Sequence, residues 1–353
     1  MIDIGAGTMD ILHYDTDTGL HYKAVVKSPV RYLAEKAAAV SGKLLVLGNE
    51  MGGGPITQVL LERAKQHGVI MSASASSTLN HDPAKVKSWG IQVVEDDRAD
   101  QLRDNQDYTV IMLSDLEPPR IEQIVKSFGV PYDFDAVAVC AQDHGVPPPG
   151  MSHLDFRHNM FKARLAEKPY PHTLLYKSDQ LPASLNRLKS IAKSAEQLPA
   201  AEIYVMDSGM AAILGASLDS RCRRKKCFLV LDIATSHTVG AAMSGEELAG
   251  FFEYHTRDIT LEKLEGLLRD LADGKLSHQQ ILSEGGHGAF LRQAVGFSAI
   301  ETIVATGPKR KLLDGSHLPI QFGAPWGDNM MTGTVGLLEA LRRRKGLETI
   351  TYR

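Results

Sequence analysis

The chain has 353 residues, of which 43% are hydrophobic and 23% charged, so it is long enough to bury a large core, and its size favours two domains over one. A formal net charge of -3 provides no global basic field to attract a polyanion, and no apolar run approaches the roughly 20 residues that a membrane-spanning helix requires. We therefore expect neither nucleic acid nor a membrane among its partners.

The cysteines and the N-terminus both bear on the cellular compartment. Three cysteines, Cys140, Cys222 and Cys227, are too few to staple a secreted fold of this size. The first residues lack the basic segment followed by an apolar one that is typical of a cleaved signal. We expect a cytoplasmic protein. The first strand starts at Met1, without the apolar residues that usually precede a functional turn, so a true start upstream of Met1 is an open alternative.

Strands and helices alternate along the first half of the chain. Apolar runs and period-two alternation predict strands, and amphipathic stretches that follow proline or polar residues predict helices. The predicted strands are residues 2–12 around a glycine turn, 21–26, 44–47, 108–113, 136–140 and 203–206. The predicted helices are residues 29–40, 55–68, 121–128, 181–197 and 208–218, and the proline-rich residues 145–150 form a loop.

A basic stretch at residues 221–226 interrupts this pattern, and a new series of elements follows it. The predicted strands of the second half are residues 228–233, 251–255 and 302–305, and its predicted helices are residues 261–271, 277–283 and 334–345. Each half begins with a strand, a polar turn and another strand. The chain therefore reads as an α/β protein whose second half repeats its first.

The sharpest motif is residues 3–10, which read Asp-Ile-Gly-Ala-Gly-Thr-Met-Asp. A dinucleotide fingerprint would need a third glycine and then a helix, and a Walker loop would need Gly-Lys-Ser or Gly-Lys-Thr, so neither fits. A hairpin fits, because its glycines let backbone N–H groups approach phosphate oxygens while an aspartate faces a hydrated cation. The predicted nucleotide-binding residues are Asp3, Gly5, Ala6, Gly7, Thr8 and Asp10. A purely structural glycine-rich hairpin is the alternative.

A second motif occupies the equivalent place in the second half, at residues 231–240, where an apolar strand again ends in an aspartate. Two such turns facing each other would bracket a triphosphate, and Asp3 and Asp232 could share one hydrated magnesium ion. The further binding residues predicted here are Asp232, Thr235, Ser236 and Thr238. Alone, this turn reads equally well as a buried strand end with small polar caps, and only the pairing of the two motifs favours the binding interpretation.

A third group of residues, 140–145, reads Cys-Ala-Gln-Asp-His-Gly and follows a predicted buried strand. Strand ends at a switch point line the cleft of open α/β folds. Asp143 or His144 could therefore serve as a general base or orient an attacking water. The alternative is a polar start of the loop, stabilised by hydrogen bonds.

Four nearby side chains, His144, His153, Asp155 and His158, are of types that ligate transition metals. Their spacing matches no compact ligand pattern, and three prolines separate the first from the others. We predict no transition-metal site among them.

The two aspartate-ended turns resemble the first and second phosphate motifs of the superfamily of sugar kinases, actin and heat-shock chaperones, and the resemblance covers most of the chain. Residues 206–215 resemble the small-residue connecting helix of that superfamily, where two crossing helices permit lobe motion. Residues 303–308 are similar to its adenosine-binding strand and turn, which adds Gly307 to the predicted binding residues. Gly323 and the helix after Gly333 resemble the second connecting segment.

The resemblance implies an α/β fold of two ribonuclease-H-like lobes, each a mixed sheet with flanking helices, around a central nucleotide cleft. The implied domains are a first lobe of residues 1–205, a connecting helix and basic loop at 206–225, a second lobe at 226–325 and a C-terminal connecting helix at 326–353. The implied cofactors are ATP and magnesium.

Residues 142–145 resemble the substrate-facing Gln-x-His-Gly turn of carbohydrate kinases, so Gln142, Asp143 and His144 are the predicted catalytic residues. Two departures affect the nucleotide site. Ala234 stands where the second phosphate motif usually has glycine, so the backbone there approaches phosphate less closely. Gly307 is a single glycine where a pair is common, which puts nucleotide choice and affinity in doubt.

The whole chain is also similar to proteins labelled as related to the activating enzyme of pyruvate formate-lyase. Radical chemistry with S-adenosylmethionine requires three cysteines in a tight cluster for an iron–sulfur centre, and the three cysteines here are scattered along the sequence. The residues do not favour that activity.

We therefore predict a protein that binds ATP and magnesium and acts as an ATPase or phosphotransferase on an unknown small molecule or partner enzyme. The alternative is a non-catalytic nucleotide sensor, or an interaction protein that retains the fold without the ligand.

Overall fold

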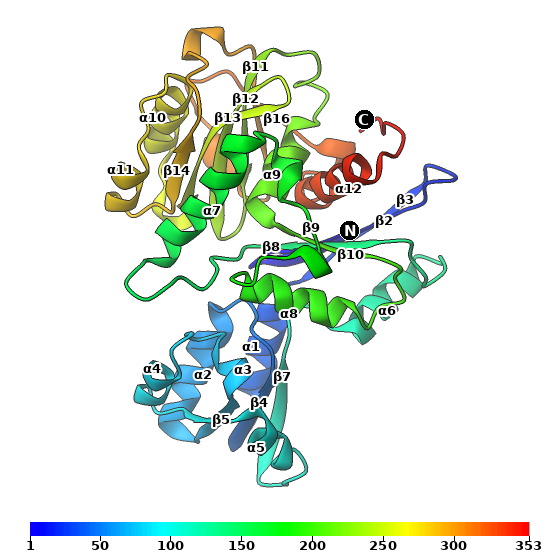
Figure 1. Cartoon of the computed structure of the whole chain (residues 1–353), viewed down its shortest axis with the longest axis vertical. Coiled ribbons are helices and arrows are strands. Elements are labelled where there is room, and N and C mark those ends of the chain that lie inside the picture. Colours follow the sequence, from blue (N-terminus) through cyan, green and yellow to red (C-terminus); the bar gives the residue numbers. More distant parts are fainter. Residues whose placement is uncertain (353) are drawn as a thin grey trace.

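A computed structural model describes residues 1–352, which form three sheets and the helices around them (Figure 1). The strands are β1 Ile2–Ile4, β2 Thr8–Tyr14, β3 His21–Lys27, β4 Lys43–Gly48, β5 Val69–Ser72, β6 Gln92–Val94, β7 Tyr108–Leu113, β8 Val137–Ala141, β9 Tyr176–Lys177, β10 Ile203–Asp207, β11 Cys227–Ile233, β12 His237–Ser244, β13 Glu247–His255, β14 Gly288–Leu291, β15 Ile303–Thr306 and β16 Ile320–Phe322. The helices are α1 Pro29–Ala39, α2 Pro55–Gln66, α3 Ala73–Ser76, α4 Pro83–Ser88, α5 Asp96–Gln101, α6 Pro118–Ser127, α7 His153–Glu167, α8 Asn186–Ala195, α9 Ser208–Ser217, α10 Leu261–Ala272, α11 His278–Ser283 and α12 Thr332–Lys345.

Two of the sheets have six strands each, and they share the order of their main strands. The first has the order β3-β2-β1-β8-β10-β9, and the second has the order β14-β13-β12-β11-β15-β16. In both sheets, three consecutive strands form an antiparallel meander. The first strand of each meander also pairs in parallel with a later strand, β1 with β8 and β11 with β15. The predicted α/β class is confirmed, and the chain forms mixed sheets in both halves.

Each of the two sheets buries side chains on both faces. On β11, Phe228 and Val230 pack into a core shared with the first sheet, while Leu229 and Leu231 point to the opposite face and pack against α10. This alternation follows from the two-residue period of a strand. A strand that is buried on both faces reads as a continuous apolar run, and the prediction of residues 228–233 rested on such a run.

Helices α9 and α12 cross between the two six-stranded sheets (Figure 1). Their backbones approach so closely that a Cβ on Gly215 would lie 1.8 Å from the carbonyl oxygen of Thr332, and a Cβ on Gly336 would lie 1.9 Å from that of Ala211. Residues 332–341 of α12 are all buried. Only glycine permits this crossing, so the small residues of both helices have a structural reason.

A third sheet stands apart from the first six-stranded sheet, although residues 1–205 were predicted to form one lobe. Strands β6-β5-β4-β7 form a four-stranded parallel sheet with its own apolar core, and Figure 1 shows this unit at the opposite end of the molecule from α10 and β11. Residues 1–205 therefore contain two sheets rather than one. Strands β5 and β6 were not predicted, because strands of four and three residues are too short to show a period.

One long helix was also missed. Helix α7 spans 15 residues but carries His, Asp, Arg and Asn among its apolar residues, so it lacks a clear apolar stripe. Its neighbour α8 begins at Asn186, five residues later than predicted, because the chain before it forms short turns. Within residues 1–352, no helix is both long and apolar enough to cross a membrane.

Candidate functional site

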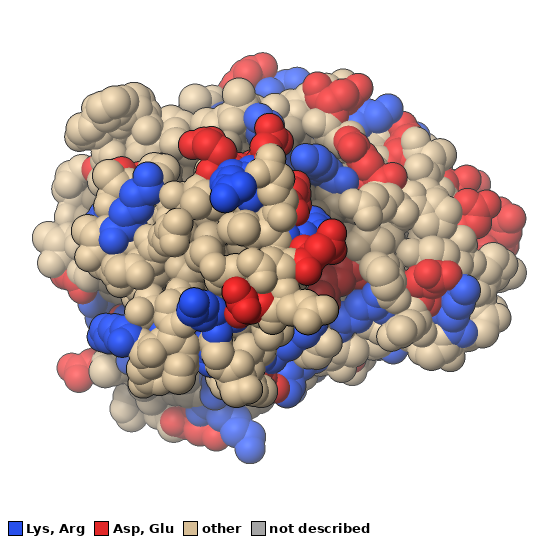
Figure 2. Space-filling view, turned by 90° about the horizontal axis from the view of Figure 1, so that it is seen from below, with Lys and Arg blue, Asp and Glu red and all other residues tan. Residues whose placement is uncertain are grey.

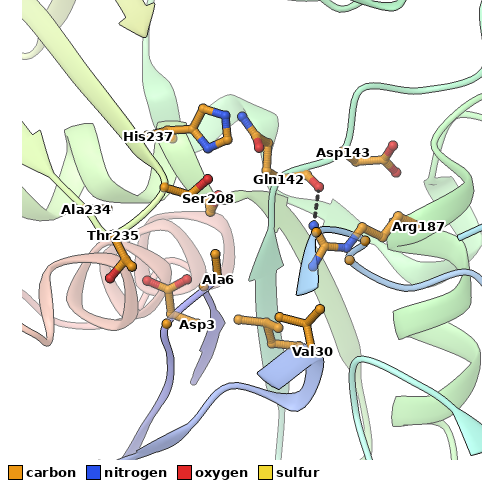
Figure 3. Close-up of a pocket in the computed structure, with 18 of the residues that line it drawn as sticks. Asp3, Ala6, Val30, Gln142, Asp143, Arg187, Ser208, Ala234, Thr235 and His237 are labelled. Carbon is orange, nitrogen blue, oxygen red and sulfur yellow. Dashed lines mark hydrogen bonds between the residues drawn. The ribbon is translucent and has the colours of Figure 1, made fainter. Parts of the chain in front are cut away.

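A cleft of about 660 Å³ is lined by residues of both six-stranded sheets and by the segments after β4 and α3, which connect strands of the third sheet. Figure 3 shows Asp3 and Thr235 on one side of this cleft, His237 and Gln142 beyond them, and Arg187 opposite. The cleft brings together most of the residues predicted from the sequence. These are Asp3, Gly5, Ala6, Gly7, Thr8, Asp10, Gln142, Asp143, His144, Asp232, Thr235, Ser236 and Gly307.

The two predicted phosphate turns are hairpins of the same construction. The Gly5 N–H donates to the Thr8 carbonyl at 3.0 Å, and the Ala234 N–H donates to the His237 carbonyl at 3.0 Å, so each turn is closed by a bond across three residues. The hairpins touch, because a Cβ on Gly7 would lie 2.7 Å from the Thr235 hydroxyl oxygen. Two equivalent hairpins from two sheets therefore meet at one wall of the cleft.

The aspartates that precede these hairpins, Asp3 and Asp232, are half-buried. Burial raises the pKa of Asp3 to about 7, with a further contribution from the charges of Asp232 and Asp207. Burial likewise raises the pKa of Asp232 to about 6, although a hydrogen bond from the Thr306 hydroxyl at 3.0 Å opposes the shift. Asp10 pairs with Asp3 across β1 and β2, and burial together with that neighbour raises its pKa to about 8. A cation beside these carboxyls would favour their charged forms.

The N-terminal end of α12 lies directly against Asp3. A Cβ on Gly333 would lie 2.0 Å from an oxygen of the Asp3 carboxyl. The first N–H groups of a helix and its dipole favour negative charge at this end. Just before α12, the amide of Asn329 donates to the Gly307 carbonyl at 3.1 Å, which ties the predicted adenosine turn to the helix start. The sequence did not single out Asn329.

The third predicted group, Gln142, Asp143 and His144, follows β8 in the cleft, but its members differ in what they contact. Both oxygens of Asp143 are occupied, since they accept the N–H groups of Gly145 at 2.8 Å and Leu188 at 2.9 Å. Figure 3 shows its side chain directed away from Asp3 and Thr235. The hydrogen-bonded loop start that we considered as the alternative describes Asp143 better than a general base does.

His144 remains near the centre of the cleft. Burial lowers its pKa to about 3, and the Arg157 guanidinium adds to that shift, so the imidazole is neutral at physiological pH. The amide of Gln142 donates to Glu253, and its backbone carbonyl accepts from Arg187 at 2.7 Å. Thus Gln142 connects the two sides of the cleft.

Thr238 is the one predicted binding residue that does not line the cleft. It is fully buried, and its hydroxyl pairs with that of Thr256 at 3.0 Å. The reason is the pleat of β12: His237 faces the cleft, so the next side chain along the strand points to the other face. The prediction counted the polar residues of the turn without assigning them to a face.

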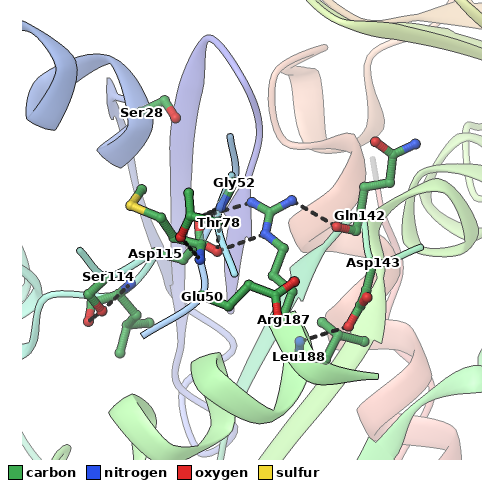
Figure 4. A network of polar contacts seen from close by, with 12 residues as sticks. Ser28, Glu50, Gly52, Thr78, Ser114, Asp115, Gln142, Asp143, Arg187 and Leu188 are labelled. Atoms are coloured by element: carbon green, nitrogen blue, oxygen red, sulfur yellow. Dashed lines mark hydrogen bonds and ion pairs between the residues drawn. The ribbon is translucent and has the colours of Figure 1, made fainter. Parts of the chain in front are cut away.

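Helix α8 and the segments that follow β4 and β7 form a group of polar contacts beside the cleft, which Figure 4 shows. The guanidinium of Arg187 forms a two-pronged bond with Asp115, with Nε–Oδ2 at 2.7 Å and Nη2–Oδ1 at 3.0 Å. Asp115 also accepts the Gly52 N–H at 3.2 Å. This N–H group, in the glycine turn before α2, therefore already has a carboxylate as its partner. Beside it, His81 pairs with Glu50 at 2.9 Å.

A buried charge network supports the opposite wall. Arg157, on the unpredicted helix α7, bonds to Asp207 at 2.8 Å and to Glu253, and all three side chains are about 5–6% exposed. Burial by itself would raise the pKa of Glu253, but the charge and hydrogen bond of Arg157, together with smaller contributions from His237 and His287, outweigh it and hold that pKa at about 2. This network was not predicted from the sequence, because Asp207 and Glu253 lie 50 and 96 positions from Arg157 along the chain.

Three histidines come together beside this network. His237 and His255 face each other across β12 and β13, and His287 follows α11. One ring nitrogen from each lies within 4.8 Å of the others, and within residues 1–352 no other group of three such ligands is so close. The sequence could have suggested the His237–His255 pair from the strand register, but nothing local marks His287.

The quartet considered from the sequence does not converge. His153 contacts the Gly145 carbonyl at 3.0 Å, while His158 stacks on His278 with ring centroids 3.6 Å apart. His144 lies instead near the three-histidine group, with its ring centroid 5.5 Å from that of His287.

A family model matches residues 51–312, which is more than half of the chain, and its description is "Putative pyruvate format-lyase activating enzyme (DUF1786)". The chain belongs to this family. A search of curated proteins found no match. Among solved structures, the chain is similar to a ROK hexokinase from Thermus thermophilus, with 10% identity over 98% of both chains and a TM-score of 0.30.

The residues of this chain do not fit the iron–sulfur cluster that the family description implies. Cys140 is buried within β8, Cys222 is buried after α9, and Cys227 begins β11, and all three are free thiols. Burial raises the pKa of Cys222 to about 12, which disfavours the thiolate that ligates iron. No three cysteines of residues 1–352 come within ligand distance of one another.

Charged side chains of both signs are mixed over the face that Figure 2 shows, which is the molecule seen from below relative to Figure 1. Neither sign forms a continuous area on that face, in keeping with the near balance of 39 basic and 42 acidic residues in the sequence.

Proposed function

We propose that the chain binds a nucleoside triphosphate, ATP by resemblance, together with magnesium in the cleft between its two six-stranded sheets, and hydrolyses it or transfers its terminal phosphoryl group. The observation that carries the proposal is the pair of equivalent hairpins, each preceded by an aspartate, that meet where Gly7 faces Thr235. In this proposal each six-stranded sheet is a ribonuclease-H-like lobe, and the chain is a member of the superfamily of sugar kinases, actin and heat-shock chaperones.

The backbone geometry supports a phosphate ligand. The Gly5 N–H closes the first hairpin, but the absence of side chains at Gly5 and Gly7 lets a phosphate approach the backbone N–H of Gly7, and Thr8, Thr235 and Ser236 offer hydroxyl donors around it. The N-terminal end of α12, where the helix dipole is positive, lies at the same place. A polyphosphate is the ligand that this arrangement of donors favours.

The carboxyl cluster supports a hard divalent cation. Asp10 is buried and Asp3 and Asp232 are half-buried, and in the absence of a cation this removal from water favours their protonated forms. Magnesium prefers oxygen ligands and keeps part of its water shell, so Asp3 and Asp232 would hold it through water or directly while it neutralises phosphate charge. Near the phosphates, Gln142 and the neutral His144 would orient the acceptor or an attacking water.

The test is the thermal stability of the protein with and without magnesium together with ATP, ADP or AMP, combined with measurement of phosphate release. We expect ATP and ADP to raise Tm only when magnesium is present, since a ligand that binds the native state stabilises it in proportion to occupancy. Asp3→Asn and Asp232→Asn should each abolish most of that shift. Asp17→Asn, in the exposed turn between β2 and β3, is the matched control and should leave it unchanged.

Two outcomes separate this proposal from its alternatives. Binding without phosphate release, in the presence of a broad set of small-molecule acceptors, would support the nucleotide sensor. No stabilisation by any nucleotide would contradict the proposal and support an interaction protein that retains the fold.

A further inference from the structure

The three histidines that meet in the cleft wall are left unused by the nucleotide proposal. Their ring centroids lie 4.6 Å apart for His237 and His255, 4.6 Å for His237 and His287, and 4.3 Å for His255 and His287. They come from two neighbouring strands and from the loop before β14, so the fold rather than the local sequence gathers them. His237 and His255 line the cleft, and His287 lies behind them.

A hydrogen bond between two imidazoles accounts for only part of this arrangement. Nε2 of His287 lies 3.0 Å from Nε2 of His255, a distance that one N–H···N bond would explain. Nε2 of His237 would then remain buried without a partner, and so would Nδ1 of His287. Buried ring nitrogens without partners are uncommon in native proteins and call for an explanation such as a bound ion.

The distances suit a single ion. Two imidazole nitrogens bound to one tetrahedral zinc ion, each at 2.0–2.1 Å, lie about 3.3 Å apart. The 3.0 Å contact between His255 and His287 is close to this value, and the third ring nitrogen needs only a side-chain rotation to join, since all three lie within 4.8 Å.

The surroundings supply the outer layer that metal-binding histidines usually have. Nδ1 of His287 lies 3.8 Å from the Glu253 carboxylate, on the side of the ring away from His255. At this distance no hydrogen bond is formed, but a small rotation of the ring would let the carboxylate accept the second ring N–H and so fix which nitrogen faces a metal. Glu253 is itself held by Arg157 and Gln142, so this contact is built into the buried network.

We propose that His237, His255 and His287 form a site for a divalent transition metal ion of the zinc class, in the wall of the cleft, with Glu253 positioning His287. Neutral imidazole ligands select zinc and its neighbours over magnesium, which prefers oxygen. Three protein ligands leave a fourth position, and the cleft lies on the side of His237 and His255. A water or an oxygen atom of a ligand in the cleft would take that position. The proposal does not depend on nucleotide binding.

The experiment is a titration of tag-free protein with cobalt(II), followed by its visible absorption, and then displacement by zinc. Excess magnesium should be present to saturate the carboxyl cluster. We expect one cobalt ion per chain, with the strong visible bands of a tetrahedral site. Because loss of an outer-layer partner alone costs about 10–100-fold in metal affinity, His255→Gln and His287→Gln should each lower the affinity by at least about tenfold.

His67→Gln, which removes an exposed histidine after α2, is the matched control and should bind cobalt as the wild type does. Circular dichroism shows whether each variant is folded. If His287→Gln fails to fold, His255→Gln carries the test, since its ring lies at the cleft surface. Absence of cobalt and zinc binding to the wild-type protein at micromolar concentrations would overturn the proposal. Equal binding by the control and both cluster variants would overturn it as well.

Discussion

The two hairpins of the cleft share a backbone but differ in charge. Asp3 and Asp232 occupy equivalent positions on β1 and β11, yet Asp3 pairs across its hairpin with Asp10, whereas Asp232 pairs with Val239. Where the first hairpin closes at Thr8, the second closes at His237. One half of the cleft therefore concentrates carboxyls, and the other combines a single carboxyl with histidines.

The difference shows that matching topology does not dictate matching chemistry. The strand order fixes where the two hairpins stand, and the side chains at each position decide whether that half attracts a hard cation or a softer one. In the acidic half, burial and the charges of nearby carboxyls raise the pKa values of Asp3 and Asp10. In the histidine half, the charge network of Arg157 holds the pKa of Glu253 low.

The largest effect is expected from breaking the charge network of the histidine half. Arg157→Met would leave Asp207 and Glu253 buried without their partner, and loss of one member of a buried ion pair costs about 3–5 kcal/mol. The free energy of unfolding, measured by urea denaturation, should fall by that amount. Arg103→Met is the control, because Arg103 and its partner Asp100 are 49% and 59% exposed, so loss of this pair should cost little. Similar losses in both variants would contradict the special role of Arg157.

The second prediction concerns Asp3 and Asp232. It compares how an Asn substitution at each position changes Tm as a function of pH in the absence of magnesium. An aspartate whose native pKa is raised costs the native state progressively more as pH rises above the unfolded value, until the native pKa is passed. Asn carries no charge at either place. The Tm of Asp3→Asn relative to wild type should therefore increase from about pH 4 and level off above about pH 7, the pKa of Asp3.

Asp232→Asn should show the same rise but level off nearer pH 6, the pKa of Asp232. Measuring Tm differences at a series of pH values cancels the contributions that both proteins share, including the N-terminal amine and the other histidines. Two curves that level off at the same pH, or a difference that falls with pH, would contradict the assigned asymmetry between the halves.

The smallest effect is expected from a substitution of Thr238. The sequence predicted that this residue contacts the ligand, but its side chain is buried in the fold. Thr238→Val removes a buried hydroxyl and its bond to Thr256, which costs about 1 kcal/mol. Denaturation should show this loss, while the magnesium-dependent nucleotide shift stays the same. Thr8→Val, on the equivalent strand of the acidic half, should weaken that shift with little effect on stability. The reverse result would restore the original assignment of Thr238.

The elements that the sequence revealed are those with strong local signals. The two aspartate-ended turns, the buried strands around them and the glycine-bearing helices α9 and α12 were all apparent from short patterns. The prediction that Thr238 binds the ligand failed because a turn motif does not indicate which side chains of the following strand face the cleft.

What escaped prediction depends on contacts between distant segments. Strands β5 and β6 are short, and helix α7 hides its buried face behind charged residues such as Arg157. The bond between Arg187 and Asp115 spans 72 positions, and His287 lies 32 positions from His255. No single window of the sequence contains both partners, so only the assembled sheets bring these side chains together.

Helix α12 has a consequence for how the chain is made. It packs between the two six-stranded sheets, contributes Leu337 and Leu341 to their shared core and lies against Asp3 in the first hairpin. All strands of both sheets precede it in the sequence. During synthesis, the first strands must therefore wait for the last helix before their common core can close. The nascent chain would expose that unfilled core along nearly its whole length, which makes it a natural client for chaperones that shield apolar surface.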